Sequence, residues 1–212
     1  MLANAPEPDR LEGERLIGMS CYRIAKSVIS VRRSAVALLL AALPVPVVAQ
    51  TQIFDEFKIG VLAHDVGFLD KHVESGADIN FEMLFTPPGL LAVVGSPRPH
   101  IGGSINTDGN TNAGYFGLTW GITLIQSLFG WGDGVFANGS FGGALQDGYT
   151  NSAPPERKKL GSTALFRGSL ELGYQATPSV SVSAFVDHMS NADLANHNAG
   201  LTNAGVRFGV KF

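Results

Sequence analysis

Apolar and polar residues alternate with a period of two through most of the chain beyond residue 53. Such alternation over short runs is typical of β-strands, and no long run shows the 3.6-residue period of an amphipathic helix. We predict eight strands, at about residues 54–68, 79–86, 100–107, 113–124, 135–145, 165–175, 180–188 and 203–212. Turn-like or strongly polar segments, such as 107–111 and 152–159, separate several of them.

The last predicted strand indicates which kind of β-protein this is. One face carries Arg207, Gly209 and Lys211. The other face is apolar and carries Ala204, Val206, Phe208, Val210 and Phe212. Segments of about ten residues with an apolar outer face and a polar inner face are typical of transmembrane β-barrels. We therefore predict an all-β fold, an eight-stranded antiparallel transmembrane β-barrel with an interior filled by side chains. The alternative is a soluble sandwich or lipocalin-like barrel, which more often turns its apolar face inward.

The N-terminal residues have the order of a secretory signal peptide. Arg23, Lys26, Arg32 and Arg33 precede a short apolar run at 35–43, and the segment closes with Val47-Val48-Ala49, which places a small residue at the cleavage point. The alternative, a transmembrane helix, is disfavoured because the run is shorter than the ~20 residues that a helix needs to span a bilayer. We predict a signal peptide at 19–49 and a barrel domain at 50–212. Residues 1–18 form an extension of uncertain status, because translation could start at Met19.

Composition excludes several classes of site from the predicted mature chain. Cys21 is the only cysteine and lies within the predicted signal peptide, so residues 50–212 can form neither a disulfide nor a cysteine metal site. The formal net charge of −3 argues against a nucleic-acid partner.

His188 and Ser190 are the strongest candidates for chemistry. Residues two apart on a strand point to the same face, roughly 6.6 Å apart at ~3.3 Å per residue. A general base beside a hydroxyl is the minimal equipment for nucleophilic ester hydrolysis. His188 continues the apolar, lipid-facing set of its strand, where an unpaired polar group is costly. The alternative is an interfacial histidine followed by a turn-forming Ser-Asn cap.

Several stretches resemble one family of outer-membrane proteins, the lipid A 3-O-deacylases of the PagL type, also called acyloxyacyl hydrolases. The similar stretches are 101–106, 109–112, 117–120, 140–144, 166–174, 188–192 and the closing strand through Phe212. The His-x-Ser-Asn-Ala element at 188–192 is the specific part, whereas the glycine-rich strand pieces mainly reflect barrel architecture.

The resemblance implies a serine esterase that removes the acyl chain ester-linked at position 3 of lipid A. Ser190 would be the nucleophile and His188 the general base, while Asn191 or nearby backbone N–H groups would stabilise the oxyanion. It implies lipopolysaccharide as substrate, the outer membrane of a Gram-negative bacterium as location, and no cofactor or metal. The sequence leaves a homodimer open.

One position departs from the family pattern. The family has a carboxylate fourteen residues after the histidine, and this chain has Thr202. A threonine hydroxyl can orient the imidazole but supplies no charge. Asp187 and Glu171 are expected to point into the barrel, which leaves Asp193 as the alternative acid. His64 has no partner that the sequence identifies.

Two further functions therefore stay open. The chain could be a catalytically weak or inactive member of the family that acts as a structural or lipid-binding barrel. It could also be a small adhesin-type or porin-like barrel whose function lies in its loops.

Overall fold

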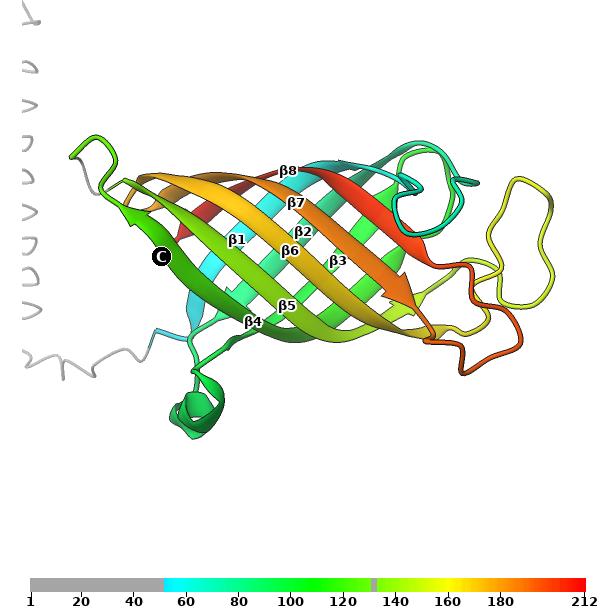
Figure 1. Cartoon of the computed structure of the whole chain (residues 1–212), viewed down its shortest axis with the longest axis horizontal. Coiled ribbons are helices and arrows are strands. Elements are labelled where there is room, and N and C mark those ends of the chain that lie inside the picture. The colour runs from blue at the N-terminus through cyan, green and yellow to red at the C-terminus, as the bar shows by residue number, and fades with distance from the viewer. Residues whose placement is uncertain (1–51, 131–132) are drawn as a thin grey trace, which may run out of the picture. The chain divides into compact units, whose positions relative to one another are not determined.

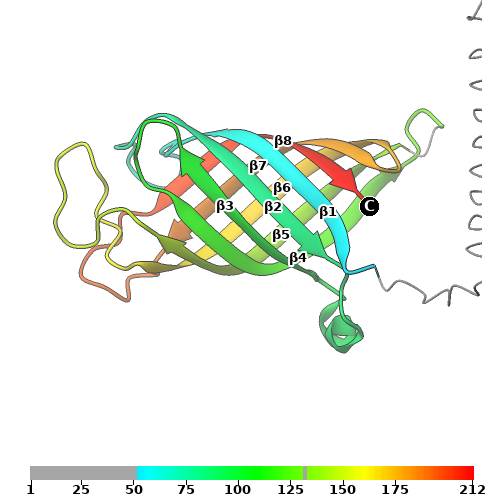
Figure 2. The same ribbon diagram turned by 180° about the vertical axis from the view of Figure 1, so that it is seen from behind.

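The computed structural model describes residues 52–130 and 133–212, so the predicted extension and signal peptide lie outside the described residues. Eight antiparallel strands pair in chain order and close into a barrel, with β1 also paired to β8 (Figures 1 and 2). The strands are β1 Phe54–Ala63, β2 Ala77–Phe85, β3 Arg98–Asn106, β4 Ala113–Gln126, β5 Gly134–Gln146, β6 Ala164–Thr177, β7 Val180–Ser190 and β8 Leu201–Lys211. The predicted fold class is confirmed.

The outer face of the barrel is apolar, as the alternation predicts. Large side chains on it are exposed between about two-fifths and two-thirds of their area, including Ile101, Phe116, Phe141, Leu170, Val182, Val206 and Phe208. A continuous belt of this kind suits the hydrocarbon core of a membrane, and strands expose no unpaired backbone groups once the barrel is closed.

The inner face is filled by buried charged side chains that pair with one another inside the lumen. Arg207 Nη2 lies 2.8 Å from Glu82 Oε1, and Arg167 Nε lies 2.9 Å from Asp187 Oδ2. Lys58 Nζ lies 2.5 Å from Glu171 Oε2. These contacts confirm that Asp187 and Glu171 point inward, where buried charges need partners.

A small apolar cluster occupies the interior near the C-terminal end of β7 and the N-terminal end of β8. It contains Ala113, Tyr115, Ala144, Leu160, Leu165, Met189 and Leu201, all buried. Met189 lies between His188 and Ser190 in sequence and points inward. The cluster therefore supports the part of β7 whose outward residues are His188 and Ser190.

The two ends of the barrel differ in their connections. At one end, which we call the turn end, β1 begins, β8 finishes and a two-residue turn at 178–179 joins β6 to β7. The other end, the loop end, carries segments 64–76, 107–112, 147–163 and 191–200 (Figure 1). Bacterial outer-membrane barrels have short periplasmic turns and longer extracellular loops, so in such a barrel the turn end would correspond to the periplasmic side.

The first strand is shorter than predicted, because it ends at Ala63 rather than near residue 68. Asp65 adopts a positive φ of 47°, and its carboxylate accepts hydrogen bonds from the backbone N–H groups of Val73 and Glu74. This local turn redirects the chain, which an apolar pattern alone could not indicate. By contrast, β7 is longer than predicted: it continues two residues further, to Ser190.

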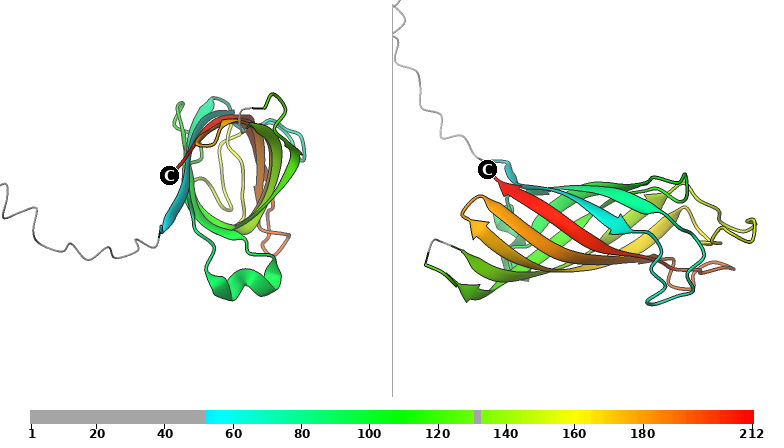
Figure 3. Two further views of the ribbon diagram at one scale, coloured as in Figure 1. Left: turned by 90° about the vertical axis from the view of Figure 1, so that its left-hand side faces the viewer. Right: turned by 90° about the horizontal axis from the view of Figure 1, so that it is seen from above.

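The only helix among residues 52–130 and 133–212 is a 3₁₀ helix, η1, at Gly89–Val94 between β2 and β3. Viewed along the barrel, η1 projects outside the ring of strands (Figure 3). Within the described part of the chain no helix is long and apolar enough to cross a membrane, a finding that has no bearing on strands.

Candidate active site

His188 and Ser190 lie at the loop end of β7 and both face outward. Burial alternates along the strand, with Asp187 and Met189 buried on the inner side and His188 and Ser190 partly exposed on the outer side. The structure therefore brings this predicted pair to one face. Within the described residues the Ser190 hydroxyl has no hydrogen-bond partner, so its oxygen is available to a substrate.

Thr202 lies beside His188 on the neighbouring strand, because the register pairs the two residues. His188 Nδ1 is 2.8 Å from Thr202 Oγ1, and Thr202 is 1% exposed. The backbone carbonyl of Thr202 accepts a hydrogen bond of 2.8 Å from the Val66 N–H. Thr202 thus hydrogen-bonds one ring nitrogen of His188. Segment 64–76 in turn hydrogen-bonds the backbone of Thr202 through Val66.

Gly200 has no side chain, and the imidazole of His188 occupies the space where one would lie. A Cβ atom on Gly200 would lie 2.5 Å from His188 Cε1 and 3.0 Å from Nε2. Both distances are far below van der Waals contact, so this position tolerates no side chain unless the ring moves. The ring edge that carries Nε2 therefore packs directly on the backbone that leads into β8.

Asn191 donates its hydrogen bonds to residues of the loops. Its side-chain Nδ2 donates to the carbonyl oxygens of Leu160 at 2.8 Å and His197 at 2.6 Å, and its backbone N–H donates to Asn198 Oδ1. Both amide hydrogens are used, so in this conformation the Asn191 side chain has no donor left for an oxyanion.

The two residues after Asn191 have an unusual backbone. Ala192 and Asp193 adopt positive φ values of 55° and 61°, a region that costs non-glycine residues energy and that often marks functional turns. Their backbone N–H groups have no hydrogen-bond partner among the described residues. These groups follow Ser190 closely in the chain and can serve as donors.

Asp193 is hydrogen-bonded to a residue of its own loop, and a different residue binds Nδ1 of the imidazole. Its Oδ1 accepts a hydrogen bond of 3.0 Å from Asn198 Nδ2, while Nδ1 of His188 is bound by Thr202. Asn198 therefore links the Asn191 backbone to the Asp193 carboxylate. Nothing in the local sequence pattern singles out Asn198, because its role depends on the return of the 191–200 loop.

Two loops are tied to the site by buried charges that sequence reasoning missed. Lys158 Nζ donates to the Gly200 carbonyl and lies 2.6 Å from Asp65 Oδ1. Lys158 and Asp65 are each at most 2% exposed. The pair joins segments 64–76 and 147–163 to the backbone that packs against His188.

His64 lies just beyond β1 between two carboxylates. Its Nε2 is 3.0 Å from Glu74 Oε2 and its Nδ1 is 2.9 Å from Asp78 Oδ1. Burial lowers the pKa of His64, but the hydrogen bonds to Asp78 and Glu74 outweigh it and raise the pKa to about 9. Glu74 also accepts from Arg157 Nε at 3.0 Å, so this charged group holds the same two loops together.

An apolar groove of about 540 Å³ lies on the outer face and is lined by Asn191 and by Phe166, the neighbours of Ser190 in sequence and in register. In register, Ser190 is next to Phe166, Phe166 next to Gly143, and Gly143 next to Phe116. Phe141 stacks on Phe166 with ring centroids 6.4 Å apart. Asn191 and Leu194 complete one wall. The arrangement provides an apolar surface on the strands next to the candidate nucleophile.

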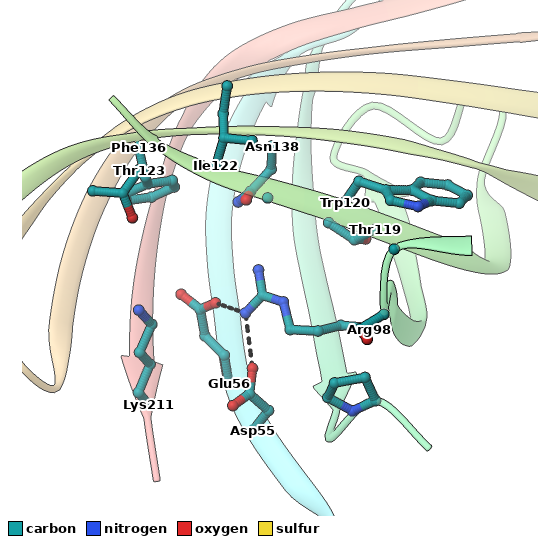
Figure 4. Close-up of a pocket in the computed structure, with 14 residues that line it drawn as sticks. Asp55, Glu56, Arg98, Thr119, Trp120, Ile122, Thr123, Phe136, Asn138 and Lys211 are labelled. Atoms are coloured by element: carbon teal, nitrogen blue, oxygen red, sulfur yellow. Dashed lines mark hydrogen bonds and ion pairs between the residues drawn. The ribbon is translucent and has the colours of Figure 1, made fainter. Parts of the chain in front are cut away.

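Among the described residues, no group of three or more His, Cys, Asp or Glu side chains could hold a metal ion. A second cavity, of about 570 Å³, opens at the turn end (Figure 4). It is lined by Arg98, which is paired with Asp55 and Glu56, and contains neither His188 nor Ser190.

These observations define a class of protein, a membrane β-barrel that carries a histidine and a serine on its lipid-facing surface at the loop end. The chain belongs to the lipid A 3-O-deacylase (PagL) family, whose model matches residues 92–211. It is an outer-membrane barrel of the lipid A deacylase type.

One solved structure supports this assignment at the level of the fold. The crystal structure of the outer membrane enzyme PagL has 16% sequence identity and a TM-score of 0.54, over 74% of this chain and 99% of that one. The N-terminal β-barrel domain of Pseudomonas aeruginosa OprF has 14% identity and a TM-score of 0.49, over 76% and 98% of the two chains. No curated protein sequence matches the chain.

Proposed function

We propose that the protein is an outer-membrane serine esterase that removes the 3-O-linked acyl chain of lipid A. The observation that carries the proposal is the outward placement of His188 and Ser190 on one face of β7, with His188 Nδ1 held by Thr202. Family membership supports the substrate class, because the family is that of the lipid A 3-O-deacylases.

In the proposed reaction, Ser190 Oγ attacks the carbonyl carbon of the ester while His188 Nε2 takes the hydroxyl proton. The resulting oxyanion is stabilised by the backbone N–H groups of Ala192 and Asp193, since the Asn191 side chain is occupied elsewhere. Loss of an oxyanion donor typically costs ~10²–10³ in rate. The intermediate collapses as His188 returns its proton to the sugar oxygen, and water then hydrolyses the acyl-enzyme by the same route.

The groove along Phe166, Gly143 and Phe116 is suited to the acyl chain that is cleaved. It is apolar and continuous with the lipid-facing belt, and Phe166 in its wall is paired in register with Ser190. An acyl chain lying there would keep its contacts with hydrocarbon while its ester carbonyl reaches the hydroxyl. Its burial against the aromatic rings would contribute roughly 25 cal/mol per Å² of apolar area.

For location we propose that residues 19–49 direct export and are removed, so that residues 50–212 form the outer-membrane barrel. The charge and hydropathy order of that segment support this proposal. At the loop end, the active site would then lie at the extracellular interface, where lipopolysaccharide head groups are found.

The deciding experiment is mass spectrometry of lipid A after incubation with the protein purified from outer membranes, beside the Ser190→Ala variant. Loss of one 3-hydroxyacyl mass with the parent alone is the expected result. Lipid A left intact by a parent shown to be folded would contradict the proposal. It would favour the second candidate, an inactive barrel of the same family, which is suggested by Thr202 at the position of the family's carboxylate.

A further inference from the structure

We propose that residues 87–97, the segment between β2 and β3 that contains η1, form an anchor that inserts into the phospholipid leaflet at the turn end of the barrel. The segment has no charged residue, since its sequence is Pro-Pro-Gly-Leu-Leu-Ala-Val-Val-Gly-Ser-Pro. None of the residues of η1 is buried by the protein. Leu90 is 76% exposed and Val93 90% exposed, which are large values for side chains of this size.

The segment projects from the side of the barrel rather than across its mouth. In Figures 1 and 3, η1 stands outside the ring of strands near the end that holds the C-terminus. A segment in this position lies next to whatever surrounds the barrel wall. Around a membrane barrel, that surrounding is the interfacial region and the outer part of the acyl chains.

A tryptophan on the lipid-facing wall fixes the segment in place. Trp120, on the outer side of β4, donates a hydrogen bond of 2.9 Å from Nε1 to the Val94 carbonyl. Gly95 closes the helix with a φ of 89°, which a residue with a side chain rarely adopts. Tryptophan is enriched at membrane–water interfaces because its ring is apolar and its N–H needs a polar partner. Here that partner is the backbone of the segment itself.

A charged group lies beside the inner side of the segment. The cavity at the turn end reaches from Gly95 and Ser96 to Arg98, Asp55 and Glu56. Figure 4 shows Trp120 directed away from this charged group. The segment therefore separates a polar barrel mouth from an apolar outer surface made by Leu90, Val93 and Val94.

This outer surface continues the lipid-facing belt. Beyond Trp120, the outward residues Ile122 and Leu124 of β4 are 62% and 51% exposed. Exposed apolar area that adjoins a membrane-facing belt is stabilised by transfer into the same hydrocarbon, whereas in water it would be a liability. Phospholipid acyl chains are the occupant that this continuity favours, and a second copy of the chain is the competing occupant.

The test places a fluorophore at Val93, whose exposure makes the substitution harmless to folding. The full chain carrying Cys21→Ser and Val93→Cys is labelled with nitrobenzoxadiazole and reconstituted in phosphatidylethanolamine–phosphatidylcholine vesicles. Matched labels are Leu172→Cys, on the outer face of β6, and Ser152→Cys, in the exposed 147–163 loop. Quenching by a lipid with a nitroxide at carbon 5 is compared with quenching by iodide.

We expect the Val93 label to be quenched by the nitroxide lipid within about twofold of the Leu172 label, and by iodide at least about threefold less than the Ser152 label. Iodide quenching equal to that at Ser152 would overturn the proposal. Shielding that disappears when the protein is diluted about tenfold in lipid would also overturn it, because a second copy would then be the occupant.

Discussion

Nδ1 of His188 lies 2.8 Å from Oγ1 of Thr202, across the pairing of β7 with β8. A hydroxyl can both donate and accept, so Thr202 is compatible with a proton on either ring nitrogen. A carboxylate only accepts, and therefore keeps the proton on Nδ1 and leaves Nε2 free as a base. Thr202 thus fixes the orientation of the ring without fixing its tautomer or stabilising its positive charge.

Thr202→Asp is expected to raise the deacylation rate, because it supplies the missing charge and selects the productive tautomer. In serine hydrolases, a neutral residue in place of the carboxylate lowers the rate by up to ~10⁴, which sets the upper bound of the gain. The measurement is the initial rate of acyl release from lipid A. Thr202→Asn is the control, since it has the same shape as Asp without the charge; equal rates for the two variants would rule out the electrostatic explanation.

Gly200→Ala is expected to reduce activity by about tenfold or more, in the range seen when a positioning contact is displaced. The added Cβ would lie 2.5 Å from His188 Cε1 and force the ring off its position. Gly114→Ala is the matched control, because a Cβ there meets nothing within 4 Å. Rates and urea midpoints of both variants should be compared. Unchanged activity of Gly200→Ala would show that the ring position is not critical.

Stability is expected to fall at alkaline pH through His64. Its pKa is raised from 6.5 to about 9, so its stabilising contribution is fully present below about pH 6.5 and is lost as the pH rises through about 9. The full contribution is on the order of 3 kcal/mol, from 1.36 kcal/mol per unit. Urea unfolding in lipid vesicles at pH 7 and pH 10 measures it. His64→Gln should be less stable at pH 7 and should lose most of the pH dependence.

Arg167→Met is expected to destabilise the barrel by about 3–5 kcal/mol, the usual cost of leaving a buried charge without its partner. Asp187 would be that charge, 1% exposed within the lumen. The double variant Arg167→Met with Asp187→Leu should recover most of the loss. Equal stability of the single and double variants, measured by urea titration, would mean that the ion pair does not dominate the effect.

Phe166→Ala is expected to raise KM for long-chain esters by about tenfold and to leave short-chain esters unaffected, in line with the transfer energy of a large apolar contact. Phe166 pairs with Ser190 in register and is 45% exposed. Phe208→Ala is the control, because Phe208 is 47% exposed on the same outer face but on β8. An equal effect of the two substitutions would place the acyl chain elsewhere.

The sequence predicts the features of this molecule that depend on strand alternation. The outward pair His188 and Ser190, the inward Asp187 and the eight strands all follow from a period of two. The period of two does not predict the contacts that complete the candidate site. Lys158 reaches Gly200 from 42 residues away, and His64 meets Glu74 only after Asp65 has turned the chain. Such contacts come from loop closure, which no local pattern encodes.

For the proposed esterase, the outward direction of His188 and Ser190 also determines how a substrate arrives. An ester that reaches them moves sideways in the plane of the membrane, and the barrel lumen plays no part in its delivery. Encounter is then a two-dimensional process. Its rate should follow the mole fraction of substrate in the leaflet, so dilution with inert lipid should slow turnover while dilution with buffer leaves it unchanged.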